Sequence, residues 1–354
     1  HMLYDYSKQD IKPGIRSDHS IVSLQFKIRN TQKSGRGFFR FNASLLKDKV
    51  YTDKVNKLID EYLALNEDET NYALKWDYLK SEIRGYTISY ASHKAKEKRE
   101  LVSQLKLELQ ILEENLNEDN LTQYKTIKRE LEEIVSEAAR GQYVRSRSKF
   151  IEESSENLKY FSKMETKNAQ SKYIKSLFVN DTLVTDPKQI LTAQKEFYAN
   201  LYKEPANIHV DENLFTEIDI PKLANTQKEL CDEAITITEL SNSLRELPNN
   251  KTPGSDGLTT EFYKFFWIKI KNLVHNSILY AFTNSSLSIE QRRGILSIIP
   301  KKGKDLRYLK NWRPLTLLNT DYKILTKLLA KRLQQVLPDL ISFDQTGYLK
   351  GRFI

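Results

Sequence analysis

Hydrophobic residues in the middle of the chain recur at helical spacing. Leu101, Leu105, Leu109, Leu112 and Leu116 follow one another at steps of four, four, three and four residues, which places them on one helix face. The polar stretch 115–120 interrupts this pattern. It then resumes with Leu121, Tyr124, Ile127, Leu131, Ile134 and Ala138. We predict two helices packed as an antiparallel hairpin, within a segment from 42 to 140 that is mostly helical. A coiled-coil module that binds a partner accounts for this segment equally well.

In the first 30 residues, hydrophobic and polar positions alternate with the two-residue period of a β-strand. Val22, Leu24, Phe26 and Ile28 alternate with polar residues after a Pro-Gly turn at 13–14, which is typical of a strand. A single strand has no partner to pair with. We therefore expect this strand to belong to a sheet that lies outside the chain, and the chain to be part of a longer protein.

The second half alternates short strands with helices. A hairpin is expected around 179–181, helices over 190–202 and from 238 to before Pro248, and strands at 295–299 and 315–318. A helix capped by Asn319 or Thr320 follows. Its inward face is predicted to hold Leu325, Leu328, Leu329, Leu333 and Val336. The predicted fold class is α+β and mostly helical.

Composition narrows the class of protein. A length of 354 residues suits two or three domains. Cys231 is the only cysteine, which excludes an intramolecular disulfide and a zinc cluster built on cysteines. No apolar run reaches the roughly 18 residues of a membrane span, and no signal peptide is visible. We expect an intracellular protein that has no membrane partner.

Positive charge is concentrated in one stretch. Residues 289–335 hold 12 Lys/Arg and 3 Asp/Glu residues, so this window carries +9, equal to the formal charge of the whole chain. Within it, Lys301, Lys302 and Lys304 share a Gly-containing turn, and Pro314 favours an extended backbone at Arg313. Lysine and arginine in such a turn suit phosphate groups. No GxxxxGK[ST] motif is present. Charge alone is equally compatible with a solvated basic face.

Several ordered segments of this region resemble the first fingers blocks of LINE-type (non-LTR) retrotransposon reverse transcriptases. They are NKTPGSDGL (250–258) with EFY (261–263), LSIIPKKGKD (296–305), NWRPLTLLN (311–319), the helix at 322–333, and DQTGY (344–348) with GR (351–352). Upstream, RSR (145–147), KYF (159–161) and FYANLY (197–202) are similar to the N-terminal extension of that family. IRSDHS (15–20) resembles the closing motif of its apurinic-type endonuclease, although a turn followed by a strand explains this motif as well.

The resemblance implies a domain order. Residues 1–30 would end the endonuclease, 31–140 would form a helical connector, 141–235 the N-terminal extension, and 236–354 the polymerase fingers. The predicted fold is thus a partial right-hand polymerase preceded by one leftover endonuclease strand.

The resemblance also implies roles for individual residues. Asp18 and His19 match an endonuclease pair in which the histidine contacts the scissile phosphate and the aspartate orients it. Arg313 matches the fingers arginine that grips the triphosphate, with Lys301, Lys302 and Lys304 as candidates for the lysine. Arg145 and Arg147 are expected to bind nucleic acid.

In such polymerases catalysis uses two Mg²⁺ ions held by palm aspartates, and none of these aspartates can be assigned in the chain. We therefore expect a catalytically inactive segment without a cofactor of its own. The parent would be an RNA-directed DNA polymerase and endonuclease that binds template RNA and target DNA in the nucleus and cytoplasm. A stand-alone nucleic-acid-binding module derived from such an element is the alternative.

Overall fold

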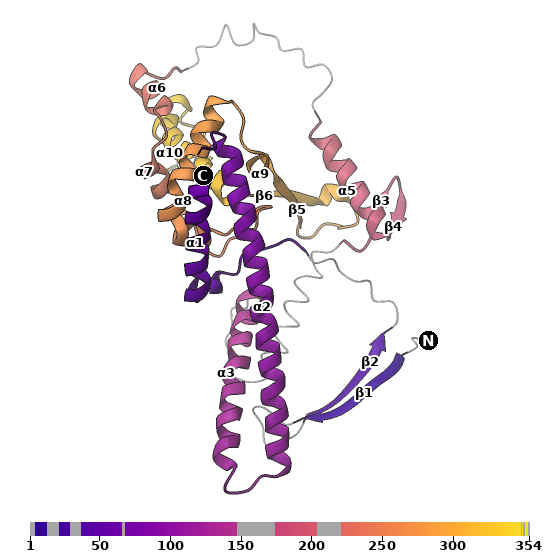
Figure 1. Cartoon of the computed structure of the whole chain (residues 1–354). Helices are drawn as coiled ribbons and strands as arrows, with labels where there is room; N and C mark the ends of the chain where they lie inside the picture. The colour runs from indigo at the N-terminus through magenta and orange to yellow at the C-terminus, as the bar shows by residue number, and fades with distance from the viewer. Residues whose placement is uncertain are drawn as a thin grey trace. The chain divides into compact units, whose positions relative to one another are not determined.

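The computed structural model describes residues 4–12, 21–28, 37–65, 68–146, 174–203, 221–347, 349 and 351–352 (Figure 1). The chain forms two compact units. The first unit comprises His1–Gly37, Tyr90–Ala193 and Pro300–Trp312, and the second comprises Phe38–Ser89, Gln194–Ile299 and Arg313–Ile354. No helix in the described part of the chain combines the length and the apolar character that crossing a bilayer requires.

A helical hairpin dominates the first unit. The long helix α2 (Tyr72–Glu114) and helix α3 (Leu121–Ser146) run side by side and are joined by a short turn at the bottom of the view (Figure 1). Leu105 and Leu109 of α2 pack on Ile127 and Leu131 of α3. Lys98 pairs with Glu137 further from the turn, which makes the two helices antiparallel. The predicted hairpin is confirmed.

The N-terminal segment contains two strands, so the expectation of a single unpaired strand was wrong. Strand β1 (Tyr4–Lys12) pairs antiparallel with β2 (Ile21–Ile28), with a bulge between Tyr6 and Lys8. Strand β1 escaped detection because its polar residues and its bulge hide the two-residue period. Ile11, Val22 and Leu24 remain 63%, 72% and 59% exposed, so these side chains have no apolar cover.

A second hairpin and a helix follow as expected. Strands β3 (Leu177–Val179) and β4 (Thr182–Val184) pair through a two-residue turn. Asn180 and Asp181 occupy this turn with φ of 47° and 60°, the left-handed conformation that a tight hairpin requires and that these two residue types tolerate. Helix α5 (Pro187–Leu201) comes next, and the Asp186 side chain accepts the backbone N–H of Gln189 at its start.

The second unit is built around helix α8 (Thr260–Thr283), against which α1 (Lys49–Leu65), α7 (Ile237–Glu246) and α10 (Thr320–Leu340) pack. The first turns of α2 contribute Trp76, Leu79 and Ile83 to the same buried core. Shorter elements complete the unit. They are η1 (Ala43–Lys47), α6 (Asn225–Asp232), α9 (Ile289–Arg292) and the strands β5 (Gly294–Pro300) and β6 (Trp312–Leu318).

Strands β5 and β6 pair with each other. At one end, a Cβ on Gly294 would lie 2.4 Å from Thr316 Cγ2. At the other end, the Lys301 N–H donates to the Asn311 carbonyl at 2.9 Å. The strands are therefore antiparallel, and β6 begins three residues earlier than the sequence indicated.

The inward face of α10 was predicted correctly except at one position. Leu325, Leu328 and Val336 are buried, whereas Leu333 is 49% exposed. Its neighbour Arg332 is buried instead, because its guanidinium donates two hydrogen bonds of 2.9 Å to the Glu239 carboxylate and others to backbone carbonyls. These hydrogen bonds offset the cost of burying the charge and turn the apolar side chain outward.

We predict that Leu131→Ala destabilises the helical hairpin by about 2–5 kcal/mol, since it deletes a side chain that is only 1% exposed. Leu107→Ala is the matched control, because Leu107 is 60% exposed on the other face of α2, and its effect should stay below about 0.5 kcal/mol. Urea unfolding followed by circular dichroism measures both changes. Equal losses for the two variants would contradict the assigned hairpin core.

Candidate nucleic-acid interface

A buried ion cluster lies at the centre of the second unit. The Lys80 ammonium on α2 is 3.0 Å from Asp321 Oδ2 on α10, 3.1 Å from Asp77 Oδ1, and 4.0 Å from Asp256 Oδ2. The indole N–H of Trp76 donates to the same Asp321 oxygen at 2.8 Å. Lys80 and Asp321 are separated by 241 positions in sequence, and no sequence pattern pointed to Lys80.

Asn319 joins the same region from the end of β6. Its carboxamide oxygen accepts the backbone N–H of Asp256 at 3.2 Å, and its amide donates to the Glu290 carbonyl at 2.7 Å. Asn319 stands at the N-cap position of α10, as one of the two predicted caps. Its side chain, however, makes no capping hydrogen bond with that helix. A Cβ on Gly254 would lie 2.1 Å from this carboxamide oxygen, so the approach requires glycine.

The charges in the cluster shift one another's pKa. Burial alone would lower the pKa of Lys80, but the negative charges of Asp321, Asp256 and Asp77 outweigh it and raise that pKa. For Asp321, burial is outweighed by the charge of Lys80 and by hydrogen bonds, which lower its pKa. Asp256 differs, because burial and the charge of Asp321 raise its pKa to about 7. One ammonium thus faces three carboxylates, and Asp256 is the carboxylate that takes up a proton.

These carboxylates do not fit a Mg²⁺ site. Lys80 occupies the position that a cation bound by Asp77, Asp256 and Asp321 would need. Elsewhere in the described residues, no group of three or more His, Cys, Asp or Glu side chains could hold a metal ion. Asp305 is likewise engaged, in an ion pair of 2.8 Å with Arg307.

The basic turn belongs to a well-held loop in the first unit. Gly303 has φ of +73°, and Lys301 Nζ donates to the Lys310 carbonyl at 2.7 Å. The Asn311 side chain donates to the Asp305 carbonyl at 2.8 Å, and the Trp312 indole donates to the Leu306 carbonyl at 2.9 Å. Residues 301–312 therefore form a fixed loop rather than a loose connection between β5 and β6.

The structure separates the cations of the 289–335 window into two groups. The first group is engaged within the chain: Arg293 with Glu290, Arg307 with Asp305, Arg332 with Glu239, Lys327 and Lys331 with Glu246, Lys323 with the Thr252 carbonyl, and Lys301 with the Lys310 carbonyl. The second group is exposed and has no ion-pair partner among the described residues. It consists of Arg292, Lys302, Lys304, Lys310 and Arg313.

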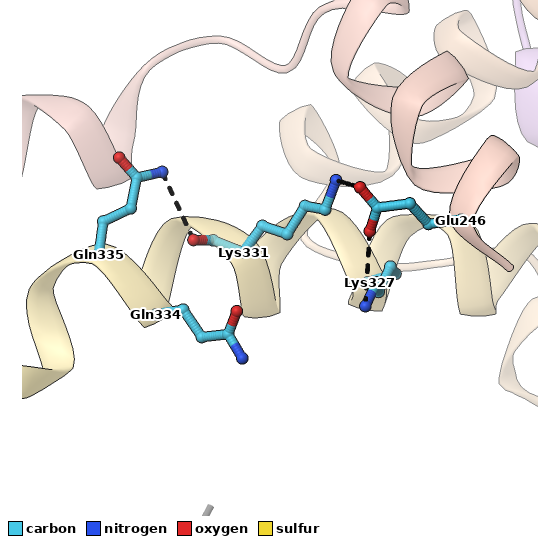
Figure 2. A pocket seen from close by; sticks show the side chains of 5 residues that line it. All are labelled: Glu246, Lys327, Lys331, Gln334 and Gln335. Carbon is cyan, nitrogen blue, oxygen red and sulfur yellow. Dashed lines mark hydrogen bonds and ion pairs between the residues drawn. The ribbon is translucent and has the colours of Figure 1, made fainter. Parts of the chain in front are cut away.

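The lysines of α10 contribute to the charge of the 289–335 window, but they make contacts inside the chain. Glu246 of α7 lies between Lys327 and Lys331 and bonds to both, at 3.7 Å in the case of Lys327 (Figure 2). Together with Gln334 and Gln335 they line a hollow of about 580 Å³. One carboxylate thus pairs with both lysines and links α7 to α10, which leaves their charge less available to a ligand than that of a lysine without an acidic partner among the described residues.

The other predicted site residues have different positions. Lys302 and Lys304 lie in the loop of the first unit, while exposed Arg313 lies on β6 in the second unit. Arg145 lies in α3. Asp18, His19 and Arg147 lie outside the described residues. The roles assigned to these residues stay predictions.

Comparison with known proteins gives two matches. A family model for reverse transcriptase (RNA-dependent DNA polymerase) matches residues 299–354. The uncharacterized 149 kDa protein of transposon TX1 from Xenopus laevis is 33% identical over 360 residues, covering 100% of the chain. The chain spans 27% of the length of that relative.

The raised pKa of Asp256 predicts a pH dependence of stability. Between its ordinary value of 3.8 and about 7, folded Asp256 holds a proton that the unfolded chain has released. The free energy of unfolding should therefore fall as pH rises through this window, by up to ~1.4 kcal/mol per pH unit from this one group. Besides burial, the groups that set the pKa of Asp256 are Asp321 and Glu290, which raise it, and Lys80 and the Leu258 N–H, which lower it.

Asp256→Asn should remove this part of the slope, because asparagine stays neutral and can still accept the Leu258 N–H. Urea unfolding at several pH values between 4.5 and 7.5 measures how the free energy of unfolding changes with pH. Asp60→Asn is the control, since Asp60 is exposed and pairs with Lys269 at the surface. An unchanged slope in Asp256→Asn would show that Asp256 is ionised throughout this range.

Proposed function

Because the chain belongs to the LINE-type (non-LTR) retrotransposon proteins, we propose that it forms part of a retrotransposon-encoded RNA-directed DNA polymerase with an endonuclease. In this proposal residues 236–354 form polymerase fingers, 141–235 the N-terminal extension, 31–140 the connector, and 1–30 the end of the endonuclease. The parent enzyme would carry out target-primed reverse transcription with Mg²⁺, in the cytoplasm and nucleus. These 354 residues on their own would bind RNA without catalysing polymerisation.

The observation that carries the RNA-binding proposal is the group of exposed cations without carboxylate partners. Lys302, Lys304 and Lys310 extend from one fixed loop, where no described acidic side chain neutralises them. An unpaired ammonium at a surface keeps its full charge for an external anion. It costs little to bring to a phosphate, because no internal ion pair has to be broken first. The repeated phosphates of RNA suit several such cations at once.

We expect no catalysis because the sequence lacks recognisable metal-binding aspartates of a polymerase palm. The palm aspartates that hold two Mg²⁺ ions in related polymerases have no counterpart among these residues, and the buried aspartates are occupied by Lys80. Arg313 remains the residue proposed to contact the triphosphate of an incoming nucleotide. Since Arg313 is exposed and has no ion-pair partner among the described residues, Arg313→Ala should change stability little.

We predict that the purified 354-residue chain extends no primer on an RNA template and nicks no plasmid DNA in the presence of Mg²⁺. The reason is the missing set of metal-binding carboxylates. Primer extension with labelled deoxynucleotides and a supercoiled-plasmid assay measure the two activities. Extension above that of a boiled sample of the same chain would overturn the prediction.

RNA binding by the basic loop should depend steeply on salt. Changing Lys302, Lys304 and Lys310 together to alanine should lower the log–log salt slope by up to roughly two units, at ~0.7 per neutralised phosphate on a single strand. Fluorescence anisotropy with a labelled oligoribonucleotide at several salt concentrations measures the slope.

The matched control replaces three lysines that the chain already uses internally. Lys323, Lys327 and Lys331 on α10 are held by the Thr252 carbonyl and by Glu246, so changing them to alanine should lower the slope less than the loop variant does. If both triple variants lowered the slope equally, RNA would bind to net charge and not to the loop.

A further inference from the structure

Four side chains of the first unit form a continuous row of cations and aromatic rings beside the basic loop. The Arg307 guanidinium carbon lies 5.0 Å from the ring centroid of Phe178. Phe178 stacks on Tyr308, with centroids 5.1 Å apart and ring planes inclined by 29°. The Lys310 ammonium lies 5.5 Å from the centroid of Tyr308. We call these four residues the aromatic row.

The backbone holds this row in place from both sides. The Phe178 N–H donates to the Arg307 carbonyl at 2.8 Å, which attaches strand β3 to the loop. On the loop side, buried Leu309 and the Trp312 indole fix the main chain around Tyr308. The rings are therefore ordered before any ligand arrives, so binding would cost little side-chain entropy.

The two ends of the row differ in their availability. Asp305 accepts hydrogen bonds from Arg307 Nε and from one of its terminal nitrogens, at 3.1 Å and 2.8 Å, so this guanidinium is neutralised and held. Lys310 is exposed and has no ion pair among the described residues. Tyr308 itself is 37% exposed. The end formed by Tyr308 and Lys310 is thus the accessible one, and only a flexible lysine has to move.

We propose that Tyr308, supported by Phe178, is a stacking site for an unpaired base of single-stranded RNA. This inference rests on the proposed function and assigns a specific contact to it. A base that stacks on Tyr308 displaces the Lys310 ammonium, which then reaches the adjoining phosphate. Lys302 and Lys304, on the same loop, contact phosphates further along the strand.

The chemistry of the row selects the kind of ligand. Stacking on an aromatic ring accepts every base, since each has a π-face, and it therefore adds affinity without sequence preference. A base inside an A-form duplex already stacks on both neighbours and has no free face for Tyr308. Single strands should consequently gain from the site, and duplexes of equal charge should not.

The test compares Tyr308→Leu with the wild-type 354-residue chain. The probe is an oligoribonucleotide that carries the fluorescent base 2-aminopurine, whose emission falls when it stacks. We expect wild-type chain to quench the probe, and Tyr308→Leu to lower affinity about tenfold and remove most of the quenching. The salt slope should stay unchanged in this variant, because no charge is lost. Tyr308→Phe, which keeps the ring, should behave as wild type.

Controls separate this site from the proposed function. Lys302→Ala with Lys304→Ala should lower the salt slope and keep the quenching. Tyr78→Leu, at a 63% exposed tyrosine of the second unit, should change neither. If Tyr308→Leu binds and quenches as wild type does, the row is a packing contact only, while salt-dependent binding by the lysines still stands. If the wild-type chain does not bind the probe, both proposals fail.

A measurement without substitution covers the case in which Tyr308→Leu does not fold. Irradiation of wild-type chain bound to RNA containing 5-iodouridine, a base that crosslinks to stacked aromatic rings, should modify the peptide that contains Tyr308. Crosslinks confined to other peptides would overturn the stacking site. A thermal melt of each variant followed by circular dichroism decides which of the two experiments applies.

Discussion

The buried ammonium of Lys80 is the constraint on which the second unit depends. A charge that is almost entirely removed from water is tolerated only where opposite charges and hydrogen bonds replace the lost hydration. Asp77, Asp321 and the more distant Asp256 meet this need, and they come from α2, α10 and the 250–258 turn. Three segments far apart in sequence must therefore assemble together. Asn319, two residues before Asp321, adds the end of β6 to the same assembly.

The middle of the chain, α1 and the first turns of α2, is part of the core of the second unit. The proposed domain order assigns residues 31–140 to a connector, yet α1 and the first turns of α2 share a core with α7, α8 and α10. Trp76 is fully buried there and packs edge-on against Tyr263 of α8. From residue 90 onward, α2 belongs to the helical hairpin of the first unit. A single helix thus serves both units, and its two halves have different physical roles.

Local periodicity was sufficient to predict the hairpin of α2 and α3, the tight turn at Asn180, and the helices α5, α7 and α10. Each of these depends on neighbours a few residues away, where spacing carries the information. Contacts between distant residues were not predictable in this way. Nothing local marks Lys80 as the partner of Asp321, and a regular leucine pattern placed Leu333 inward because the burial of Arg332 depends on Glu239, 93 positions away. The sequence predicted that the 301–304 turn is basic, but it did not predict that Phe178 packs against this loop.

The net charge of the basic window overstates what a ligand can use. Lys327 and Lys331 of α10 pair with Glu246 of α7, and Lys323 donates to the Thr252 carbonyl in the 250–258 turn, so these lysines contribute to packing within the second unit. Lys302, Lys304 and Lys310 of the 301–312 loop have no ion-pair partner among the described residues. The loop is held instead by Asn311, Trp312 and Lys301, whose side chains donate to backbone carbonyls within it. Among the described residues, the loop thus engages two of its five cations, Lys301 and Arg307, and the other three stay exposed. Rigid backbone together with free charge is the combination that an RNA-binding loop needs, and a count of lysines and arginines cannot distinguish it from a helix surface of the same charge.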